Sequence, residues 1–256
     1  MSRPRAIVTG GSRGIGRAIA QTLAGMGYDL ALTFTSRRDE AEAAAQELRE
    51  LGARAQSFQL ELSQPDTFAS VTEEALDFLG GLDAFIANAG VDFRGASVVA
   101  TPYDELLQHM TINALSAHAL CRLLLPSLRE TGIAKGAAHI VFLSSVATAM
   151  RGPDYAPYVM SKLALEGLAS VLAQEERCYG LRINTVAPGL TDTDMGKRFI
   201  GSDVPGPVRD RIIAGQAYGH VCTPAEIADV VGFLVSPAAR YVNGQRIYVD
   251  GGGPQL

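Results

Sequence analysis

Apolar residues along this chain fall into two patterns that alternate almost from end to end. Short β-branched or aliphatic runs predict seven strands, within residues 5–9, 29–34, 54–60, 83–88, 139–145, 182–187 and 246–250. Between them, apolar positions three and four residues apart predict helices over 14–26, 38–51, 65–79, 102–129, 156–178 and 224–235. Such alternation is typical of right-handed βαβ crossovers. The predicted fold class is therefore α/β, with a doubly wound parallel sheet that has helices on both faces.

The loops between these elements are short, and the sequence contains no repeat, low-complexity tract or linker. We therefore predict one domain over residues 1–256, a length that can bury a substantial core. The charged helix 38–51 is interpreted as a solvated face without a function of its own. A net charge of -5 argues against nucleic acid as a partner, because nucleic-acid binding normally needs a basic patch.

Cysteines and histidines are scattered through the sequence. Cys121, Cys178 and Cys222 have no CxxC spacing, so free thiols are favoured over disulfides or a zinc site. The four histidines lie far apart, and no metal is expected. No secretory signal or apolar run of about 18 residues is found, so the sequence predicts a cytoplasmic protein with no membrane partner.

The glycine-rich stretch TGGSRGIG, residues 9–16, follows the first predicted strand and opens the first predicted helix. Glycine allows a sharp turn and a close approach to the backbone. Free N–H groups and the positive end of the helix dipole favour a phosphate at such a helix start. The looser spacing of Gly10, Gly14 and Gly16 also fits an ordinary strand–helix turn, so the rest of the sequence must decide.

Polar residues follow several of the later strands, at the sheet edge where doubly wound folds bind their ligands. They are the NAG stretch at 88–90, Ser145 after the fifth strand, and the PG pair at 188–189. Tyr158 and Lys162 lie four residues apart, on one face of the next helix. A nearby cation lowers the pKa of a tyrosine from about 10 toward neutrality, which would suit an acid in catalysis. Alone, this spacing also occurs by chance.

Taken together and in this order, these motifs resemble the short-chain dehydrogenases/reductases over essentially the full length. The segment TPAEIADVVGFLVSPAARYVNGQRIYVDGG, residues 223–252, is most similar to the 3-oxoacyl-acyl-carrier-protein reductase branch. The resemblance implies a Rossmann-type sheet of seven strands and a nicotinamide cofactor across the strand ends. The glycines would then let the backbone approach the cofactor pyrophosphate.

The resemblance also implies a role for each catalytic residue. Tyr158 would protonate the carbonyl oxygen during hydride transfer, and Lys162 would lower the Tyr158 pKa and hold the nicotinamide ribose. Ser145 would stabilise the charge that develops on the substrate oxygen. Asn113, in TINALSA, would keep a water in a proton relay behind Lys162, while Ser144 is interpreted as structural.

The cofactor is predicted to be NADP(H), because no acid follows the second strand before Asp39. Arg13, Ser36 and Arg37 could instead surround a 2′-phosphate. Glu61 stands where the family often has an aspartate that contacts adenine. The full set of expected cofactor contacts is Gly10, Ser12, Arg13, Gly14, Ile15, Gly16, Ser36, Arg37, Glu61, Leu62, Asn88, Ala89, Gly90, Tyr158, Lys162, Pro188, Gly189 and Thr191.

The predicted reaction is NADPH-dependent reduction of a ketone, that of a 3-oxoacyl thioester carried by acyl-carrier protein or coenzyme A. Tyr155, seven residues before Lys162, keeps an enoyl-thioester reductase open as the alternative. A dehydrogenase of another small alcohol and a non-catalytic NADP(H) sensor also remain. Tyr179 stands where a carrier-protein reductase would have an arginine, although Lys135 and Arg177 lie nearby.

Two further expectations concern the surface. Residues 190–219 are punctuated by glycine and proline, and we predict a substrate lid there, with Met195, Phe199 and Ile200 as candidate lining. They could equally be packing residues between two short helices. The helices within 102–129 and 156–178 correspond to those that pair across two-fold axes in the family. A homodimer or homotetramer is therefore expected.

Overall fold

The computed structural model describes residues 3–92, 95–200, 210 and 214–252, without the side chains of Phe199 and Ile200. In this part of the chain, seven parallel strands form one sheet in the order β3-β2-β1-β4-β5-β6-β7. They are β1 (Arg5–Val8), β2 (Asp29–Phe34), β3 (Ala55–Gln59), β4 (Ala84–Ala87), β5 (Ala138–Leu143), β6 (Leu181–Pro188) and β7 (Arg246–Val249). The predicted α/β fold is confirmed. Strand order reverses between β1 and β4, where such sheets form a binding crevice.

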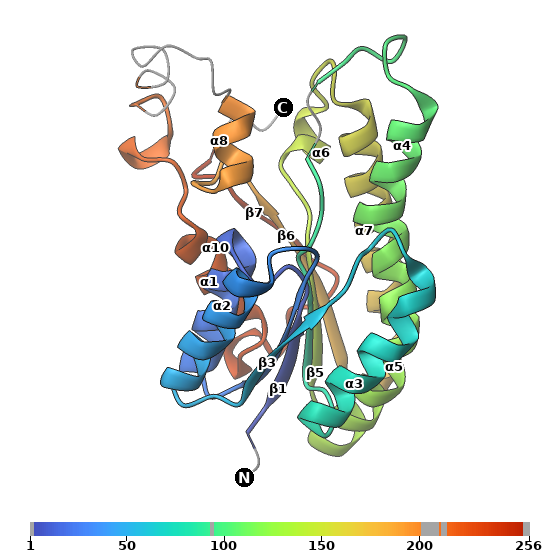
Figure 1. Cartoon of the computed structure of the whole chain (residues 1–256), viewed down its shortest axis with the longest axis vertical. Coiled ribbons are helices and arrows are strands. Elements are labelled where there is room, and N and C mark those ends of the chain that lie inside the picture. Colours follow the sequence, from blue (N-terminus) through green and yellow to red (C-terminus); the bar gives the residue numbers. More distant parts are fainter. Residues whose placement is uncertain (1–2, 93–94, 201–209, 211–213, 253–256) are drawn as a thin grey trace.

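Helices cover both faces of the sheet (Figure 1). One face carries α1 (Gly14–Gly25), α2 (Arg38–Glu50) and α10 (Pro224–Leu234), and the other carries α3 (Phe68–Leu79), α5 (Ser116–Lys135) and α7 (Ala156–Glu175). At the end of the sheet where the strands terminate lie α6 (Ala147–Met150) and α8 (Asp194–Ile200). Among the described residues, four 3-10 turns complete the connections: η1 (Pro65–Thr67), η3 (Arg177–Tyr179), η4 (Ala217–Gly219) and η5 (Pro237–Ala239).

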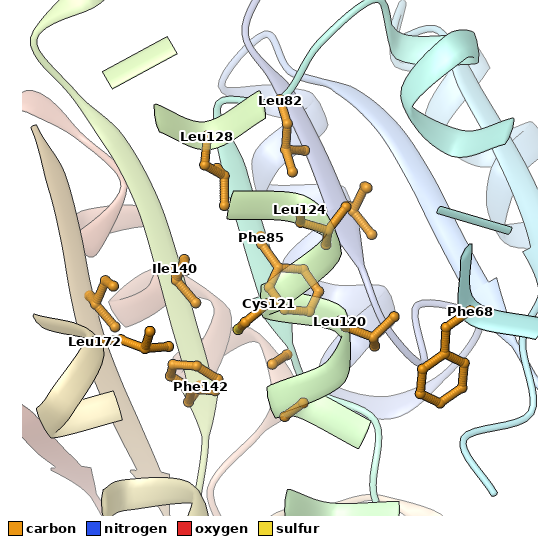
Figure 2. Close-up of a cluster of buried hydrophobic side chains, with 14 of the residues drawn as sticks. Phe68, Leu82, Phe85, Leu120, Cys121, Leu124, Leu128, Ile140, Phe142 and Leu172 are labelled. Atoms are coloured by element: carbon orange, nitrogen blue, oxygen red, sulfur yellow. The ribbon is translucent and has the colours of Figure 1, made fainter. Parts of the chain in front are cut away.

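Two apolar layers explain why the strand sequences read as continuous apolar runs. On one face, Phe85 and Phe142 from the central strands pack beneath Cys121 and Leu124 of α5 (Figure 2). On the other face, Leu32 belongs to the layer formed with α1, α2 and α10. Because strands buried on both faces lack a polar side, their register is fixed by packing above and below the sheet. This rigid platform positions the loops that leave β1, β4, β5 and β6.

The predicted single helix over 102–129 is wrong in detail. The structure instead has α4 (Tyr103–Met110), a π-helical turn η2 (Thr111–Leu115) and then α5, which runs on to Lys135. Asn113 lies in the π turn, and its side chain bonds the backbone of Val91 in a neighbouring loop. A π turn adds one residue to the helix, and such insertions are frequent at functional sites.

The other boundaries differ little from the predictions. The helix predicted over 156–178 ends at Glu175, and the 3-10 turn η3 (Arg177–Tyr179) follows it. The short α6 was not predicted, since four residues are too few for a periodic apolar pattern. Within the described ranges, no helix is long and apolar enough to cross a membrane.

Candidate active site

The glycine turn lies between β1 and α1, at the crevice where strand order reverses. Gly10 and Gly14 have φ values of 64° and 54°, which favour glycine. A Cβ on Gly16 would lie 2.2 Å from the Gly10 oxygen, so no side chain fits there. The sequence needs these glycines because the turn is left-handed and tightly packed.

The NAG segment after β4 holds this turn in place. Asn88 Nδ2 donates to the backbone oxygens of Thr9, at 2.9 Å, and Gly10, at 3.3 Å. Thr9 Oγ1 in turn accepts from the N–H groups of Asn88 and Ala89, each at 3.0 Å. Asn88 was predicted as a cofactor contact. In the structure its side-chain amide nitrogen instead stabilises the glycine turn.

The residues predicted to bind a 2′-phosphate lie on the surface beside the turn. Arg13 forms an ion pair with Asp194 of α8 at 3.1 Å, and Arg37 pairs with Glu40 at 2.7 Å. Both arginine side chains are about half exposed, and Ser36, which directly precedes Arg37, is exposed as well. The positive charges are present, but carboxylates already contact them.

Ser145, Tyr158 and Lys162 come together at the carboxyl end of β5. The Ser145 side chain acts on Tyr158, whose pKa it lowers, and Ser145 Oγ accepts from the N–H of Ala147 at 3.2 Å. Lys162 is buried, lies 5.8 Å from the centre of the Tyr158 ring, and donates to the Leu143 carbonyl at 2.9 Å. One strand end and one helix face therefore assemble a hydroxyl, a phenol and an ammonium.

The electrostatics of this group differ from the prediction. Burial raises the pKa of Tyr158, and the hydrogen bond from Ser145 only partly opposes it. Burial also lowers the pKa of Lys162 to about 8, while Glu166 acts in the opposite direction. Burial therefore acts against the shift toward neutrality predicted for the Tyr158 pKa, and the role of Lys162 in that shift stays a prediction.

Asn113 connects the π turn to the catalytic helix. Its Nδ2 donates to Ser161 Oγ at 3.0 Å and to the Val91 oxygen at 3.1 Å, and its Oδ1 accepts from the Val91 N–H at 2.8 Å. A Cβ on Gly90 would meet Asn113 Oδ1 at 2.8 Å and Lys162 Nζ at 3.4 Å. Asn113 thus lies beside Lys162, where the resemblance placed it.

The remaining predicted contacts lie around the same sheet edge. Glu61 Oε1 accepts from the N–H and hydroxyl of Ser63, which closes a turn after β3. Gly189 donates to the Val249 oxygen at 2.9 Å, and Thr191 Oγ1 donates to the Gly189 oxygen at 3.0 Å. The other predicted positions are Ser12, Leu62 and Pro188, which are buried, and Ile15, which is partly exposed.

Part of the predicted lid lies within the structure. Thr191 forms an isolated parallel bridge with Cys222, and Met195 is partly buried on α8. The side chains of Phe199 and Ile200, and residues 201–209 and 211–213, lie outside the described residues. A second ion pair joins α8 to the β4 loop, between Arg198 and Asp92 at 3.3 Å.

Sequence reasoning missed Glu166, whose carboxylate contacts Ser144, Thr148 and Arg246. The only sequence signal was an acid four residues after Lys162 on an otherwise apolar helix. Its partners are brought together by the tertiary fold, so spacing could not reveal them.

A dinucleotide fits these residues. The glycine turn leaves no room for side chains, and the side chain of Arg13, at the N-cap of α1, makes no capping hydrogen bond to the helix. The first N–H groups of α1 therefore face the turn as an anion site. No group of three or more metal-ligating side chains occurs among the residues described.

Comparison with known proteins agrees with this geometry. Residues 10–253 match the family model described as Enoyl-(Acyl carrier protein) reductase. The chain is 32% identical over 248 residues to the 3-oxoacyl-[acyl-carrier-protein] reductase FabG of Vibrio cholerae, covering 96% of each chain.

Two solved structures extend the comparison. One is a 3-oxoacyl-[acyl-carrier protein] reductase from Brucella melitensis in complex with NAD, with a TM-score of 0.90, 27% identity and coverage of 98% of this chain and 97% of that one. The other is a short chain dehydrogenase from Burkholderia cenocepacia J2315 in complex with NADP, with a TM-score of 0.85, 32% identity and 97% coverage of both.

This chain belongs to the short-chain dehydrogenase/reductase family. It is an oxidoreductase of the class that acts on alcohol and ketone groups, within a family whose solved members include complexes with NAD and with NADP.

Proposed function

We propose that this enzyme reduces the ketone of a 3-oxoacyl thioester to a secondary alcohol, with NADPH as the reductant. The observation that carries the proposal is the gathering of the Ser145 and Tyr158 hydroxyl groups with the buried Lys162, whose ammonium lies 5.8 Å from the Tyr158 ring centre. Two hydroxyl donors at one point suit a carbonyl oxygen, on which negative charge develops during reduction.

In this reaction the cofactor supplies a hydride to the carbonyl carbon. Ser145 and Tyr158 would bind the carbonyl oxygen, and Tyr158 would transfer its proton to that oxygen. Its raised pKa keeps Tyr158 protonated at neutral pH, the form that reduction requires. A protonated Lys162 would stabilise the phenolate that remains. Asn113 fixes the backbone of Val91, in the loop next to Lys162.

Reduction of a carbon–carbon double bond is the competing proposal, because the matching family model is described by an enoyl reductase. Tyr155 is the tyrosine that this reaction would use, and it lies one residue before α7. The Ser145 side chain acts on Tyr158, whose pKa it lowers, and Lys162 lies 5.8 Å from the centre of the same ring. This contact, together with the name of the Vibrio cholerae relative, favours ketone reduction.

A panel of acetoacetyl and crotonyl thioesters, simple ketones and sugars, with NADPH oxidation as the readout, tests this choice. We expect acetoacetyl thioester turnover that falls by about 10²–10⁴-fold in Tyr158→Phe. Tyr155→Phe is the matched control and should retain turnover within a few fold. Crotonyl reduction that depends on Tyr155, without ketone turnover, would replace the proposal. If NADPH binds and no substrate turns over, the sensor alternative gains support.

For the thioester carrier we propose acyl-carrier protein or coenzyme A. The basic residues expected to meet an acidic carrier protein are partly neutralised here. Lys135 pairs with Asp83 at 2.5 Å, and Tyr179 lies under the Arg129 guanidinium. We therefore expect kcat/KM with coenzyme A thioesters to be at least comparable to that with the carrier protein. A strong preference for the carrier protein would show that Arg177 or other surface groups suffice.

We also propose that residues 190–219 form a substrate lid on a single catalytic domain and that the enzyme assembles into dimers or tetramers. Exposed apolar side chains on the described helices, such as Leu115, Ile133 and Val171, support assembly. Light scattering at micromolar concentration tests it, and a monomer mass would contradict it.

A further inference from the structure

Glu166 is a largely buried carboxylate behind the catalytic group, one helical turn after Lys162 on α7. Its side chain is 11% exposed. Oε1 accepts from Ser144 Oγ at 2.6 Å and from Thr148 Oγ1 at 2.8 Å, and Oε2 pairs with Arg246 at 2.5 Å. One carboxylate therefore joins the end of β5, the short helix α6, the catalytic helix α7 and the edge strand β7.

The contacts of Glu166 lie on both sides of Ser145. Ser144 precedes it directly, and its N–H donates to the Val186 oxygen at 2.8 Å. Thr148 follows it, and its N–H donates to the Ser145 carbonyl at 3.2 Å. The single hydroxyl proton of Thr148 is shared between that carbonyl, at 2.9 Å, and Glu166 Oε1, at 2.8 Å. Glu166 thus fixes the backbone around Ser145 without contacting the Ser145 hydroxyl, which stays available to Tyr158.

The same carboxylate acts electrostatically on Lys162. Burial lowers the pKa of Lys162 to about 8, and Glu166 is the group that raises it. Among the described residues, other charged or titratable groups near this part of α7 include Tyr158 and Tyr155 at its start, His109 on α4, Asp92 after β4 and Arg246 on β7. Asp92 acts on Tyr158, and His109 bonds the Asp92 oxygen at 2.9 Å.

Water has access to the outer side of this network. A cavity of about 250 Å³ between α7 and the β6–β7 edge is lined by Glu166 and Arg246, among others. The ion pair therefore borders solvent, whereas Ser144 and Thr148, which contact the other carboxylate oxygen, are buried residues. The Glu166 carboxylate can therefore be solvated at Oε2, beside Arg246, while Ser144 and Thr148 position it at Oε1.

We propose that Glu166 is a positioning residue that holds Ser145 against Tyr158 and places a negative charge one helical turn from Lys162 on the same face of α7. The effect on turnover rests on the ketone reduction proposed above. The effect on Lys162 does not, so the two can be tested apart.

The titration of Lys162 can be followed directly, because the chain has three lysines, Lys135, Lys162 and Lys197. In protein labelled with ¹³Cε-lysine, Lys135→Arg and Lys197→Arg variants would assign the Lys162 signal. We expect Glu166→Gln to lower the Lys162 pKa by about 0.5 to 1 pH unit, because an opposite charge is lost. Glu166→Asp should retain most of the wild-type value.

Arg246→Gln gives a prediction of opposite sign. It removes the cation that pairs with Glu166, so the Lys162 pKa should rise. If both variants only loosened the site, Glu166→Gln and Arg246→Gln would shift the Lys162 pKa in the same direction. Glu176, a buried carboxylate paired with Arg129 just beyond the far end of α7, provides the matched control. Glu176→Gln should lower the melting temperature and leave the Lys162 titration unchanged.

The kinetic test uses the acetoacetyl thioester reaction. In Glu166→Ala we expect kcat to fall by about 10- to 100-fold, with a smaller change in KM, because Ser144 and Thr148 lose their acceptor and Ser145 loses its position. In Glu166→Gln, which keeps an acceptor oxygen but no charge, the basic limb of the pH–rate profile should move to lower pH. An unchanged Lys162 titration in a folded Glu166→Gln variant would overturn the counter-charge role, and unchanged kcat in a folded Glu166→Ala variant would overturn the positioning role.

Failure of the variant to fold would not end the test. Arg246→Gln then decides: an upward shift of the Lys162 pKa supports the proposal, and no shift refutes it. If the wild-type enzyme reduces no ketone, the proposed function fails while the lysine titration still tests Glu166.

Discussion

The catalytic region and the adenosine-side region of this enzyme are built differently. Lys162 is held by a buried hydrogen bond to the Leu143 carbonyl of β5, and Ser145 by part-buried hydrogen bonds with Ala147 and Thr148 of α6. Arg13 and Arg37, at the other end of the crevice, are about half exposed and paired with acids on flexible side chains. Buried hydrogen bonds define geometry strictly, whereas exposed ion pairs contribute little and exchange readily. Under the proposed function, the fold would fix the reaction chemistry, and cofactor discrimination would depend on adaptable charges.

The largest effect is expected from a substitution that changes the catalytic region and leaves the adenosine-side region intact. Ser145→Ala removes one donor to the substrate oxygen, and kcat should fall by about 10²–10³-fold. NADPH affinity, measured by the fluorescence of the bound cofactor, should change less than threefold. A comparable loss of cofactor affinity would mean that the two regions are not separable.

A stability test addresses the buried sheet beneath the catalytic region. His139 of β5 is buried, and within the described residues its Nδ1 has no hydrogen-bond partner. Burial, with help from Arg182, lowers the pKa of His139 to about 4. In the unfolded chain, His139 takes up a proton below its usual pKa of about 6.5, whereas in the folded protein it does so only near pH 4. The folded state therefore has its full stability above pH 6.5 and loses stability as the pH falls from 6.5 toward 4.

The loss should reach roughly 3 kcal/mol over that window. Urea unfolding of His139→Leu between pH 7 and 4.5 should show a smaller decline than the wild type. His118→Gln, on the exposed face of α5, is the control and should keep the wild-type slope. Equal slopes for wild type and His139→Leu would exclude His139 as the cause.

The glycine turn tests how strictly the cofactor end is shaped. Gly16→Ala would place a methyl group 2.2 Å from the Gly10 oxygen and should cost about 1–3 kcal/mol through forced displacement of the turn. Cofactor affinity should fall for NADPH and NADH alike. Gly25→Ala, in the same helix with open space around it, should be neutral or slightly stabilising.

The smallest effect concerns the exposed arginines. Arg13→Ala should reduce NADPH affinity about tenfold and leave NADH affinity nearly unchanged, because a charge-assisted contact to the 2′-phosphate is lost and solvent screens part of it. Asp194→Asn should raise NADPH affinity a few fold, since it frees Arg13. The kcat/KM ratio for the two cofactors measures both. A wild-type ratio that favours NADH would refute the NADPH proposal.

Much of the molecule follows from local sequence. The seven strands and the main helices were predictable because buried parallel strands and amphipathic helices leave distinct apolar periods. The glycine turn was recognisable because only glycine tolerates its φ values and its close contacts. Tyr158 and Lys162 were recognisable because one helical turn separates them in sequence and in space.

Tertiary structure decided what depends on residues distant in sequence. The π turn at Asn113 arises from bonds to Val91 in another loop, so helical periodicity alone continued the helix through it. The direction of the Tyr158 pKa followed from burial, a property that spacing does not contain. Glu166 acquired its partners only when β5, α6 and β7 converged on α7, because its contacts link positions up to 80 residues apart.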